Sequence, residues 1–391
     1  MKKIAVVCAL GLLLLVPRAV FASEEPMEAG VPITLTSPSA ILTEASTGRV
    51  IFEKNADERR PVASVTKVMT ILLTLEALDE GSVTEKDSVL VSEHAAGMGG
   101  SQAFLDANRS YPLGELLGSV IIASANDSAV ALAEYLCGAE EAFVRRMNER
   151  AAQLGLANTH YVNCTGLPAS DHYTTARDIA RLSAQLDAHP RYYQYSTVWM
   201  KDFQHSGGRI TQLTNTNRLI RFYPGCDGYK TGSTNEARYC ISATAKKNGM
   251  RLIAVVLGSD ASQTRFDEAR SMLEYGFASV QLFTPISEGD SLDMTVPVRL
   301  GGRDGVSVVS GGTGTLLLRR GEQSGISLEA ALLERVTAPV HRGDVLGEIR
   351  VRRGDEILMT IPAVAGEDVA LPGMLSSLLR IRDGFMLPVG R

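Results

Sequence analysis

The apolar residues between positions 64 and 187 recur mostly with a helical period, whereas the segments on either side have strand-like patterns. Before this block, two short β-rich runs flank a Ser-Thr-Gly turn within 40–54 and predict a hairpin. The other clear patterns are helical at 68–78, 113–136, 141–154 and 264–277, and strand-like at 227–231, 239–245 and 251–258. Strands, a helical block and then more strands predict an α+β domain over 38–280 in which early and late strands share one sheet.

The pattern changes after about Pro285, where the apolar runs become short and the turns become rich in glycine. The strand-like runs are 292–299, 306–310, 314–319 and 345–351. Short strands at this spacing predict a small all-β domain of sandwich type over 285–370. The segment 372–391 follows, with apolar residues beside Arg380 and Arg382. It is either an amphipathic helix that lies on a bilayer or a terminal helix docked on its own domain.

The first residues have the layout of a secretory signal peptide. Lys2 and Lys3 precede an apolar run at 4–16, and Val20-Phe21-Ala22 offers small residues at the usual cleavage spacing. We therefore expect residues 1–22 to be removed and 23–37 to form a polar leader of an exported protein. The alternative is an uncleaved anchor, but the apolar run is short for a membrane-spanning helix.

Composition narrows the classes of function. The 391 residues carry a formal net charge of -5 and contain no dense basic cluster, which argues against nucleic-acid binding. With 45% hydrophobic and 21% charged residues, the chain can bury a sizeable core in two domains. The cysteines and histidines lack metal-site spacing, so we expect neither a zinc peptidase nor another metal or cofactor.

The four cysteines of the exported chain are Cys137, Cys164, Cys226 and Cys240. An oxidising compartment permits disulfides, and Cys226 and Cys240 could face each other across a hairpin. The alternative is that they are buried free thiols, which pack as small apolar groups.

The first string with chemical potential is Ser64-Val65-Thr66-Lys67, where the helical pattern begins. Residues three apart face the same way on a helix, so the Lys67 ammonium points at the Ser64 hydroxyl. A lysine can serve as base for such a hydroxyl if burial and a neighbouring cation lower its pKa. The Ser64 N–H at the helix start can help to hold an oxyanion. Alone, the pair is better explained as a capping serine beside a solvated lysine, because Ser-x-x-Lys is frequent by chance.

Two later strings complete an acyl-transfer site. Ser124 and Asn126 follow an apolar stretch and would lie between two helices, where Ser124 could relay a proton and Asn126 could hold a substrate amide. Alone they are a helix-capping cluster. Lys230-Thr231-Gly232 lies in a strand pattern with little side-chain cover, to which a peptide could add as an extra strand. Lys230 and Thr231 would bind its carboxylate and the Ser233 N–H would complete the oxyanion site. The alternative is an edge-strand lysine that opposes aggregation.

Together these strings resemble the low-molecular-weight penicillin-binding proteins, the serine-type D-alanyl-D-alanine carboxypeptidases of peptidase family S11, with sporulation-type members of Firmicutes nearest. Further matching strings are Pro-Val-Ala-Ser at 61–64, Asn-Cys-Thr-Gly-Leu-Pro at 163–168, His-Tyr-Thr-Thr-Ala-Arg-Asp at 172–178 and Asp-Gly-Tyr at 227–229. The resemblance runs from about Pro38 to the C-terminus. It implies the penicillin-binding/β-lactamase-like transpeptidase fold, with an antiparallel sheet and a helical subdomain, followed by the β-rich module.

The resemblance also implies roles and partners. Ser64 would be the acylated nucleophile, Lys67 its base and Ser124 the third catalytic group. Asn126, Lys230, Thr231, Gly232 and Ser233 would bind the substrate. The substrate would be the pentapeptide stem of peptidoglycan, and β-lactams would be covalent inhibitors. The tail would bind the outer face of the cytoplasmic membrane.

One departure concerns the substrate carboxylate. Some family members have an arginine upstream of Lys-Thr-Gly that grips it, and here that region reads Asn-Thr-Asn-Arg at 215–218. Arg218 is a weak substitute for that arginine, so carboxylate recognition would depend more on Lys230 and Thr231.

Two other functions compete with this reading. A β-lactamase on a related scaffold is disfavoured because no Glu-x-x-Leu-Asn string supplies a deacylating base and lactamases lack the β-module. A sensor that keeps the site without turnover is disfavoured by the intact Ser64 and Lys67.

Overall fold

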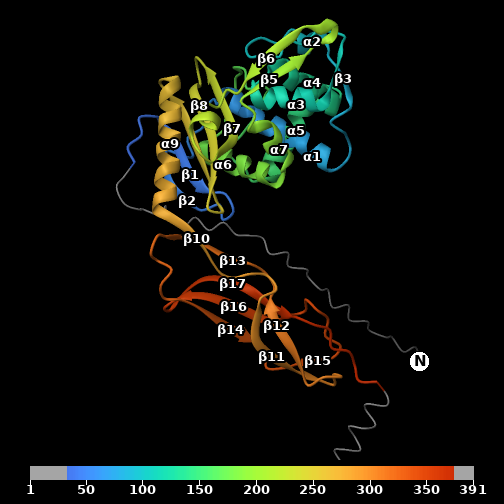
Figure 1. Cartoon of the computed structure of the whole chain (residues 1–391), viewed down its shortest axis with the longest axis vertical. Coiled ribbons are helices and arrows are strands. Elements are labelled where there is room, and N and C mark those ends of the chain that lie inside the picture. The colour runs from blue at the N-terminus through green and yellow to red at the C-terminus, as the bar shows by residue number, and fades with distance from the viewer. Residues whose placement is uncertain (1–32, 374–391) are drawn as a thin grey trace, which may run out of the picture.

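The computed structural model describes residues 33–373, so the predicted signal peptide, most of the leader and residues 374–391 of the predicted tail lie outside the described residues. Figure 1 shows a mixed upper part, made of a sheet flanked by helices, and a lower part made of strands. The helix α9 leads directly into β10 and thus joins the two parts.

A five-stranded antiparallel sheet forms the centre of the upper part, in the order β2-β1-β9-β8-β7. Its strands are β1 (Ser39–Glu44), β2 (Val50–Lys54), β7 (Cys226–Thr234), β8 (Arg238–Lys247) and β9 (Met250–Ser259). The early hairpin therefore pairs with the late strands, as the sequence predicts. The strand that carries Lys-Thr-Gly, β7, is an edge strand, so one row of its backbone groups faces away from the sheet.

Helices cover both faces of this sheet. The helix α9 (Ser262–Ser279) packs on β8 and β9, whereas α6 (Ala176–Gln185) packs on the opposite face of β9 and β1. Alternate residues of β9 consequently enter two different cores, Ile253 with the α6 side and Leu252 with the α9 side. This double burial explains why the sequence of β9 is continuously apolar over 252–257.

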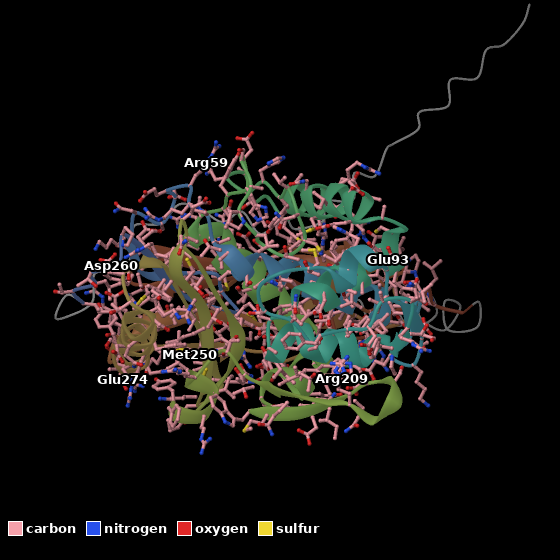
Figure 2. The ribbon with its side chains drawn as sticks, turned by 90° about the horizontal axis from the view of Figure 1, so that it is seen from above. Arg59, Glu93, Arg209, Met250, Asp260 and Glu274 are labelled. Atoms are coloured by element: carbon pink, nitrogen blue, oxygen red, sulfur yellow. The ribbon has the colours of Figure 1, made fainter. Side chains whose placement is uncertain are left out.

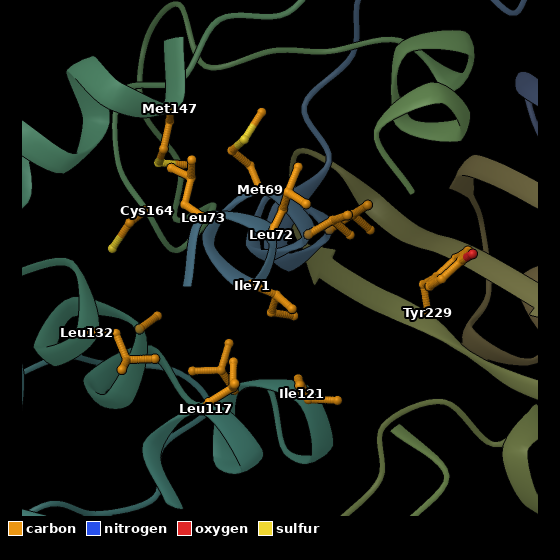
Figure 3. Close-up of a cluster of buried hydrophobic side chains, with 14 of the residues drawn as sticks. Met69, Ile71, Leu72, Leu73, Leu117, Ile121, Leu132, Met147, Cys164 and Tyr229 are labelled. Atoms are coloured by element: carbon orange, nitrogen blue, oxygen red, sulfur yellow. The ribbon is translucent and has the colours of Figure 1, made fainter. Parts of the chain in front are cut away.

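The helical subdomain stands beside β7 and is built around α1 (Lys67–Asp79). Figure 3 shows α1 at the centre of the core, with Leu117 and Leu132 approaching from other helices and Tyr229 from β7. The remaining helices of the upper part are α2 (Glu93–Ala96), α3 (Leu113–Ile122), α4 (Asn126–Cys137), α5 (Glu140–Gln153), α7 (Arg191–Ser196) and α8 (Leu219–Phe222), with 3-10 turns at Ala63–Thr66, Leu186–Ala188 and Ser206–Gly208.

Two small hairpins complete this part, β3 (Ser88–Leu90) with β4 (Ser110–Pro112), and β5 (Met200–Gln204) with β6 (Ile210–Thr214). Arg209 ties the second hairpin to the loop before β4, because its guanidinium donates to the Phe104 carbonyl at 2.8 Å and to Asp106 at 2.7 Å. Figure 2 shows Arg209 between the hairpin and the helices.

The helical pattern predicted over 113–136 is interrupted. The helix α3 ends at Ile122 and α4 begins at Asn126, because Ser124 adopts a left-handed backbone conformation with φ of 65°. The apolar period continues across the break, so the pattern alone does not reveal it. The break has a positional consequence, since it places Ser124 and Asn126 at the junction of two helices rather than along one.

The lower part is all β, as predicted, and its two sheets share one core. The larger sheet has the order β14-β16-β17-β12-β11-β15 and the smaller one pairs β10 with β13. The strands are β10 (Val280–Ile286), β11 (Ser291–Arg299), β12 (Gly305–Ser310), β13 (Gly314–Arg319), β14 (Ile326–Leu332), β15 (Val336–Thr337), β16 (Val345–Arg353) and β17 (Glu356–Ala365). The sequence patterns missed β10, β14, β15 and β17.

The disulfide hypothesis for Cys226 and Cys240 is wrong. Cys226 lies opposite Ala245 and Cys240 opposite Gly232, so the two thiols are far apart along the β7–β8 ladder. All four cysteines within the described residues are free, and three of them are buried, which confirms the alternative of buried thiols.

Candidate active site

The turn that carries Ser64 is a 3-10 turn over Ala63–Thr66 that runs directly into α1 at Lys67. The Nζ atom of Lys67 lies 2.9 Å from Ser64 Oγ and donates to the Thr165 carbonyl at 2.7 Å. The Lys67 side chain is fully buried. The predicted contact between a serine and a lysine three residues later is therefore present, with one additional partner that the sequence does not reveal.

Burial lowers the pKa of the Lys67 ammonium to about 7, because a charge is disfavoured away from water. The charges that act on Lys67, those of Cys164 and Asp127, work in the opposite direction and raise its pKa. The predicted effect of a neighbouring cation is found instead at Lys230. Burial, and then the charges of Lys67 and Arg265, hold the pKa of Lys230 well below its ordinary value.

The segment behind this turn locks its geometry. Gly166 has φ of 82°, and a Cβ atom there would overlap the Ala63 carbonyl, so the Asn-Cys-Thr-Gly string requires glycine at this position. His172 accepts the Val162 N–H on Nδ1, which leaves its Nε2 to donate to Thr66 Oγ1 at 2.8 Å. Burial lowers the pKa of His172 to about 4, so it stays neutral and holds the Thr66 side chain at ordinary pH.

The strand β7 approaches the Ser64 turn through Gly232. A Cβ atom at Gly232 would lie 2.5 Å from the Val62 carbonyl oxygen and 2.8 Å from the Ser64 backbone nitrogen. Lys230 and Thr231 are buried in the same strand, whereas Ser233 is exposed. The Lys230 ammonium donates to the Thr231 carbonyl at 3.1 Å. The absence of a side chain at Gly232 thus allows the edge strand to contact the backbone at Ser64.

Arg265, on α9, is a site residue that sequence reasoning missed. Its guanidinium donates to the Gly232 carbonyl at 2.8 Å and to the Cys240 carbonyl at 3.2 Å, and the side chain is only 7% exposed. Burial lowers the pKa of Arg265 to about 10. This buried cation holds β7 and β8 together beside Lys230, and no local sequence motif marks it.

Ser124 and Asn126 contribute buried oxygen atoms without protein partners. Ser124 Oγ and Asn126 Oδ1 make no hydrogen bond to any described residue. The Asn126 amide nitrogen donates to the Gly99 carbonyl at 2.7 Å, and the neighbouring Asp127 carboxylate accepts from backbone N–H groups of the same loop. Buried polar atoms are normally satisfied, so two unsatisfied oxygens at one helix junction indicate a place for a ligand.

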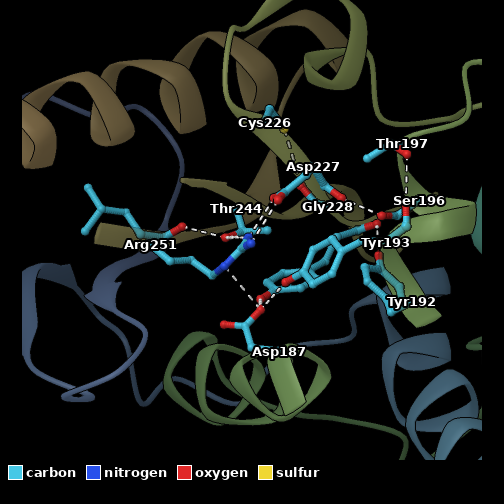
Figure 4. Close-up of polar contacts among 12 residues, drawn as sticks. Asp187, Tyr192, Tyr193, Ser196, Thr197, Cys226, Asp227, Gly228, Thr244 and Arg251 are labelled. Atoms are coloured by element: carbon cyan, nitrogen blue, oxygen red, sulfur yellow. Dashed lines mark hydrogen bonds and ion pairs between the residues drawn. The ribbon is translucent and has the colours of Figure 1, made fainter. Parts of the chain in front are cut away.

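A second polar network, centred on Asp187 and Arg251, supports β7 (Figure 4). Asp187 accepts from Tyr229 at 2.6 Å and also from Tyr193, and Arg251 lies 3.4 Å from the same carboxylate. Arg251 in turn forms a bidentate pair with Asp227 at 2.6 and 2.8 Å. Burial raises the pKa of Asp187 above its ordinary value. The network fixes Asp227 and Tyr229, which lie three positions and one position before Lys230.

The segment 215–218 links the helical subdomain to β7. The Thr216 N–H donates to the Ile122 carbonyl at 3.0 Å, and the Asn217 amide donates to the Gly228 carbonyl at 2.9 Å. Arg218 is exposed and its charge contributes to the lowered pKa of Arg265.

The structure thus brings Ser64, Lys67 and Gly232 into contact and places Lys230 within electrostatic range of Lys67. Ser124 lies between α3 and α4, Asn126 begins α4, and both helices pack on α1, but among the described residues no hydrogen bond joins Ser124 to Lys67. Thr165, His172 and Asp187 were missed as well. Thr165 and His172 lie in strings that contributed to the resemblance. Their partners, Lys67 and Thr66, are about a hundred positions away in the sequence.

Two family profiles together match most of the chain. Residues 23–261 match the family profile of the D-alanyl-D-alanine carboxypeptidases (peptidase S11), and residues 281–371 match the C-terminal domain of penicillin-binding protein 5. The chain is 38% identical to D-alanyl-D-alanine carboxypeptidase DacF of Bacillus subtilis, over 88% of each protein. It is 34% identical to DacC of Escherichia coli, over 96% of this chain and 93% of that protein.

A solved structure has the same architecture. The crystal structure of penicillin binding protein 5 from Haemophilus influenzae is similar to the present one with a TM-score of 0.77 and 29% sequence identity. The match covers 87% of this chain and 99% of that one. The similarity therefore extends over both parts of the described chain.

We predict that Gly232→Ala lowers the rate of acylation by a β-lactam about 100-fold, because the new methyl group pushes β7 away from the Ser64 turn and a displacement of about 1 Å has an effect of that size. The measurement is the second-order rate constant for acylation by a fluorescent penicillin. Gly312→Ala is the control, because its Cβ meets only Ile361 at an ordinary 3.4 Å. Equal acylation rates for the two variants would contradict the close approach.

Proposed function

The chain belongs to the D-alanyl-D-alanine carboxypeptidase family, peptidase family S11, and on that premise we propose that it removes the terminal D-alanine from peptidoglycan pentapeptides through an acyl-enzyme on Ser64. The observation that carries the proposal is the 2.9 Å contact between Ser64 Oγ and a fully buried Lys67 whose pKa is about 7. A lysine in this environment is substantially neutral at physiological pH, so it can accept a proton from the hydroxyl.

In the acylation step, Ser64 Oγ attacks the carbonyl carbon between the two D-alanines and passes its proton to Lys67. The carbonyl oxygen becomes negative as the tetrahedral intermediate forms. The N–H groups of Ser64 and Ser233 stabilise this charge. Ser233 is suited to this role because it lies on an edge strand directly after Gly232, which contacts the Ser64 turn.

Departure of the terminal D-alanine breaks the C–N bond and requires a proton on the leaving amine. Ser124 relays that proton from Lys67, since its hydroxyl is buried and has no hydrogen-bond partner within the described chain. The unsatisfied Asn126 oxygen accepts the N–H of the preceding stem residue. Water then attacks the ester carbon, Ser64 regains its proton, and the shortened peptide leaves.

The carboxylate of the terminal D-alanine binds at the cationic end of β7. Lys230 and Thr231 contact it, and Arg218 and Arg265 add positive charge nearby. The edge position of β7 lets the stem peptide pair with it as an added strand. A β-lactam presents a strained amide and a carboxylate in a similar arrangement, so it acylates the same serine but is released slowly.

We further propose that the protein acts outside the cytoplasm, at the outer face of the cytoplasmic membrane. The export signal of the sequence and the peptidoglycan substrate both support this location. Residues 33–373 contain no helix that combines the length and apolarity needed to cross a bilayer. We also propose that the segment 372–391 attaches the protein to this membrane; its residues 374–391 lie outside the described residues.

Labelling by a fluorescent penicillin tests the nucleophile. We expect the full-length exported protein to form a covalent adduct that localises to the peptide containing Ser64, and we expect Ser64→Ala and Lys67→Ala to lose at least about 10³-fold in acylation rate. Release of D-alanine from a synthetic peptide ending in D-Ala-D-Ala should fall in parallel. An adduct on Ser64→Ala equal to that on the wild type would rule out the assignment.

The pH dependence tests the base. Since the neutral form of Lys67 accepts the proton, we expect the acylation rate constant to increase about tenfold per pH unit below pH 7 and to level off above it. Lys67→Arg should be inactive at every pH, because a guanidinium stays protonated. A rate that is constant from pH 5 to 9 would contradict the proposed role.

A further inference from the structure

Three side chains form a surface cluster outside the site described above. Trp199, Arg221 and Phe222, here called the Trp199 platform, pack together with an edge-to-face ring contact of 6.1 Å between Trp199 and Phe222. The Arg221 guanidinium lies 5.5 Å from the centre of the Trp199 ring and 5.7 Å from that of Phe222. The result is a small aromatic surface with one positive charge.

The Trp199 platform is accessible to solvent, because Arg221 and Phe222 are exposed and Trp199 is partly exposed. Phe222 is 61% exposed and the neighbouring Met200 is 46% exposed. Among residues 33–373 no carboxylate pairs with Arg221, whose contacts are the two rings. Exposed apolar side chains that gather at one place, rather than singly, mark a surface that binds something.

The backbone ties this platform to the active site. The Trp199 carbonyl accepts the Asn215 N–H at 2.8 Å, and the Asn215 amide donates to the Val198 carbonyl at 3.0 Å. Two residues further, Asn217 donates to Gly228, which lies two positions before Lys230. The helix α8, which carries Arg221 and Phe222, follows immediately. The platform therefore adjoins the end of β7 that precedes Lys230.

This position determines which part of the substrate could reach the platform. In the proposed function the carboxylate binds at Lys230 and the oxyanion at Ser233, so the stem peptide extends from Ser233 away from Gly228. The sugar attached to that stem lies at the other end of β7. A ligand of the platform therefore lies beyond the departing D-alanine and belongs to a neighbouring part of the cell-wall polymer.

We propose that the Trp199 platform binds the glycan of a neighbouring peptidoglycan strand. The inference rests on the proposed function, which supplies the polymer. The C–H faces of N-acetylated amino sugars stack on aromatic rings, and a guanidinium donates to their hydroxyl, acetamido and carboxylate oxygens. The cluster is too small for a stable protein interface, which buries about 800 Å² on each partner.

The protein offers a direct optical probe, because Trp199 is its only tryptophan. We expect a saturable change in tryptophan fluorescence when the full-length protein is titrated with a soluble tetramer of N-acetylglucosamine. Arg221→Ala and Phe222→Ala should each weaken this binding at least about fivefold. Tyr135→Ala is the matched control, because Tyr135 is an aromatic residue of α4 that is 40% exposed and whose hydroxyl donates to Asp87 rather than to the platform. No fluorescence change, or equal loss in the control, would overturn the proposal.

Activity on two substrates separates this inference from the proposed function. With insoluble peptidoglycan rich in pentapeptides, we expect Arg221→Ala and Trp199→Ala to release D-alanine at least about fivefold more slowly than the wild type. With a soluble synthetic peptide ending in D-Ala-D-Ala they should match the wild type, which also shows that they fold. If the variants match the wild type on both substrates, the proposed role of the platform is wrong. If the wild type binds the sugar tetramer but cleaves neither substrate, the proposed function is refuted and the platform is not. If the tryptophan fluorescence responds only to anionic lipid vesicles, the ligand of the platform is a membrane and not a glycan.

Discussion

The removal of the Lys67 amine from water is the physical constraint on which the rest of the site depends. An exposed lysine is protonated at neutral pH and cannot take a proton from a hydroxyl, whereas the buried Lys67 has a pKa of about 7. Burial of an amine is unfavourable, and the fold compensates in part by giving Nζ two oxygen partners, Ser64 Oγ and the Thr165 carbonyl. Helices α3, α4 and α6 pack around α1 and exclude water from this amine.

A second constraint is the close approach of three backbone segments at Ser64. Gly166 and Gly232 leave room for the Ala63 and Val62 carbonyls, and a methyl group at either glycine would separate the segments. The sheet edge is held against this turn from two sides, by Arg265 on one and by the Asp187 network on the other. Ala63 and Ser124 both have positive φ, of 49° and 65°, so the backbone is strained where the two helical elements meet the site. Strain at such positions persists only when surrounding contacts enforce it.

Sequence patterns predicted local relations well and distant ones poorly. The Ser64–Lys67 contact follows from helical spacing, and the shared sheet follows from the order of strands and helices. The break at Ser124 was missed because apolar periodicity continues across it. Arg265 and Asp187 were missed because each acts on β7 through a contact between residues 33 to 42 positions apart, which no short motif encodes. The proposed disulfide failed for a related reason, since spacing alone does not fix the register of a hairpin.

The protonation state of Lys67 can be measured without reference to activity. Lysine residues labelled with ¹³C at Cε report deprotonation through their chemical shift, and comparison of the wild type with Lys67→Arg identifies the Lys67 signal. The account predicts that this signal titrates with a pKa near 7, several units below the exposed lysines. A Lys67 signal that titrates near 10.4, with the exposed lysines, would contradict the claim that burial makes this amine a base.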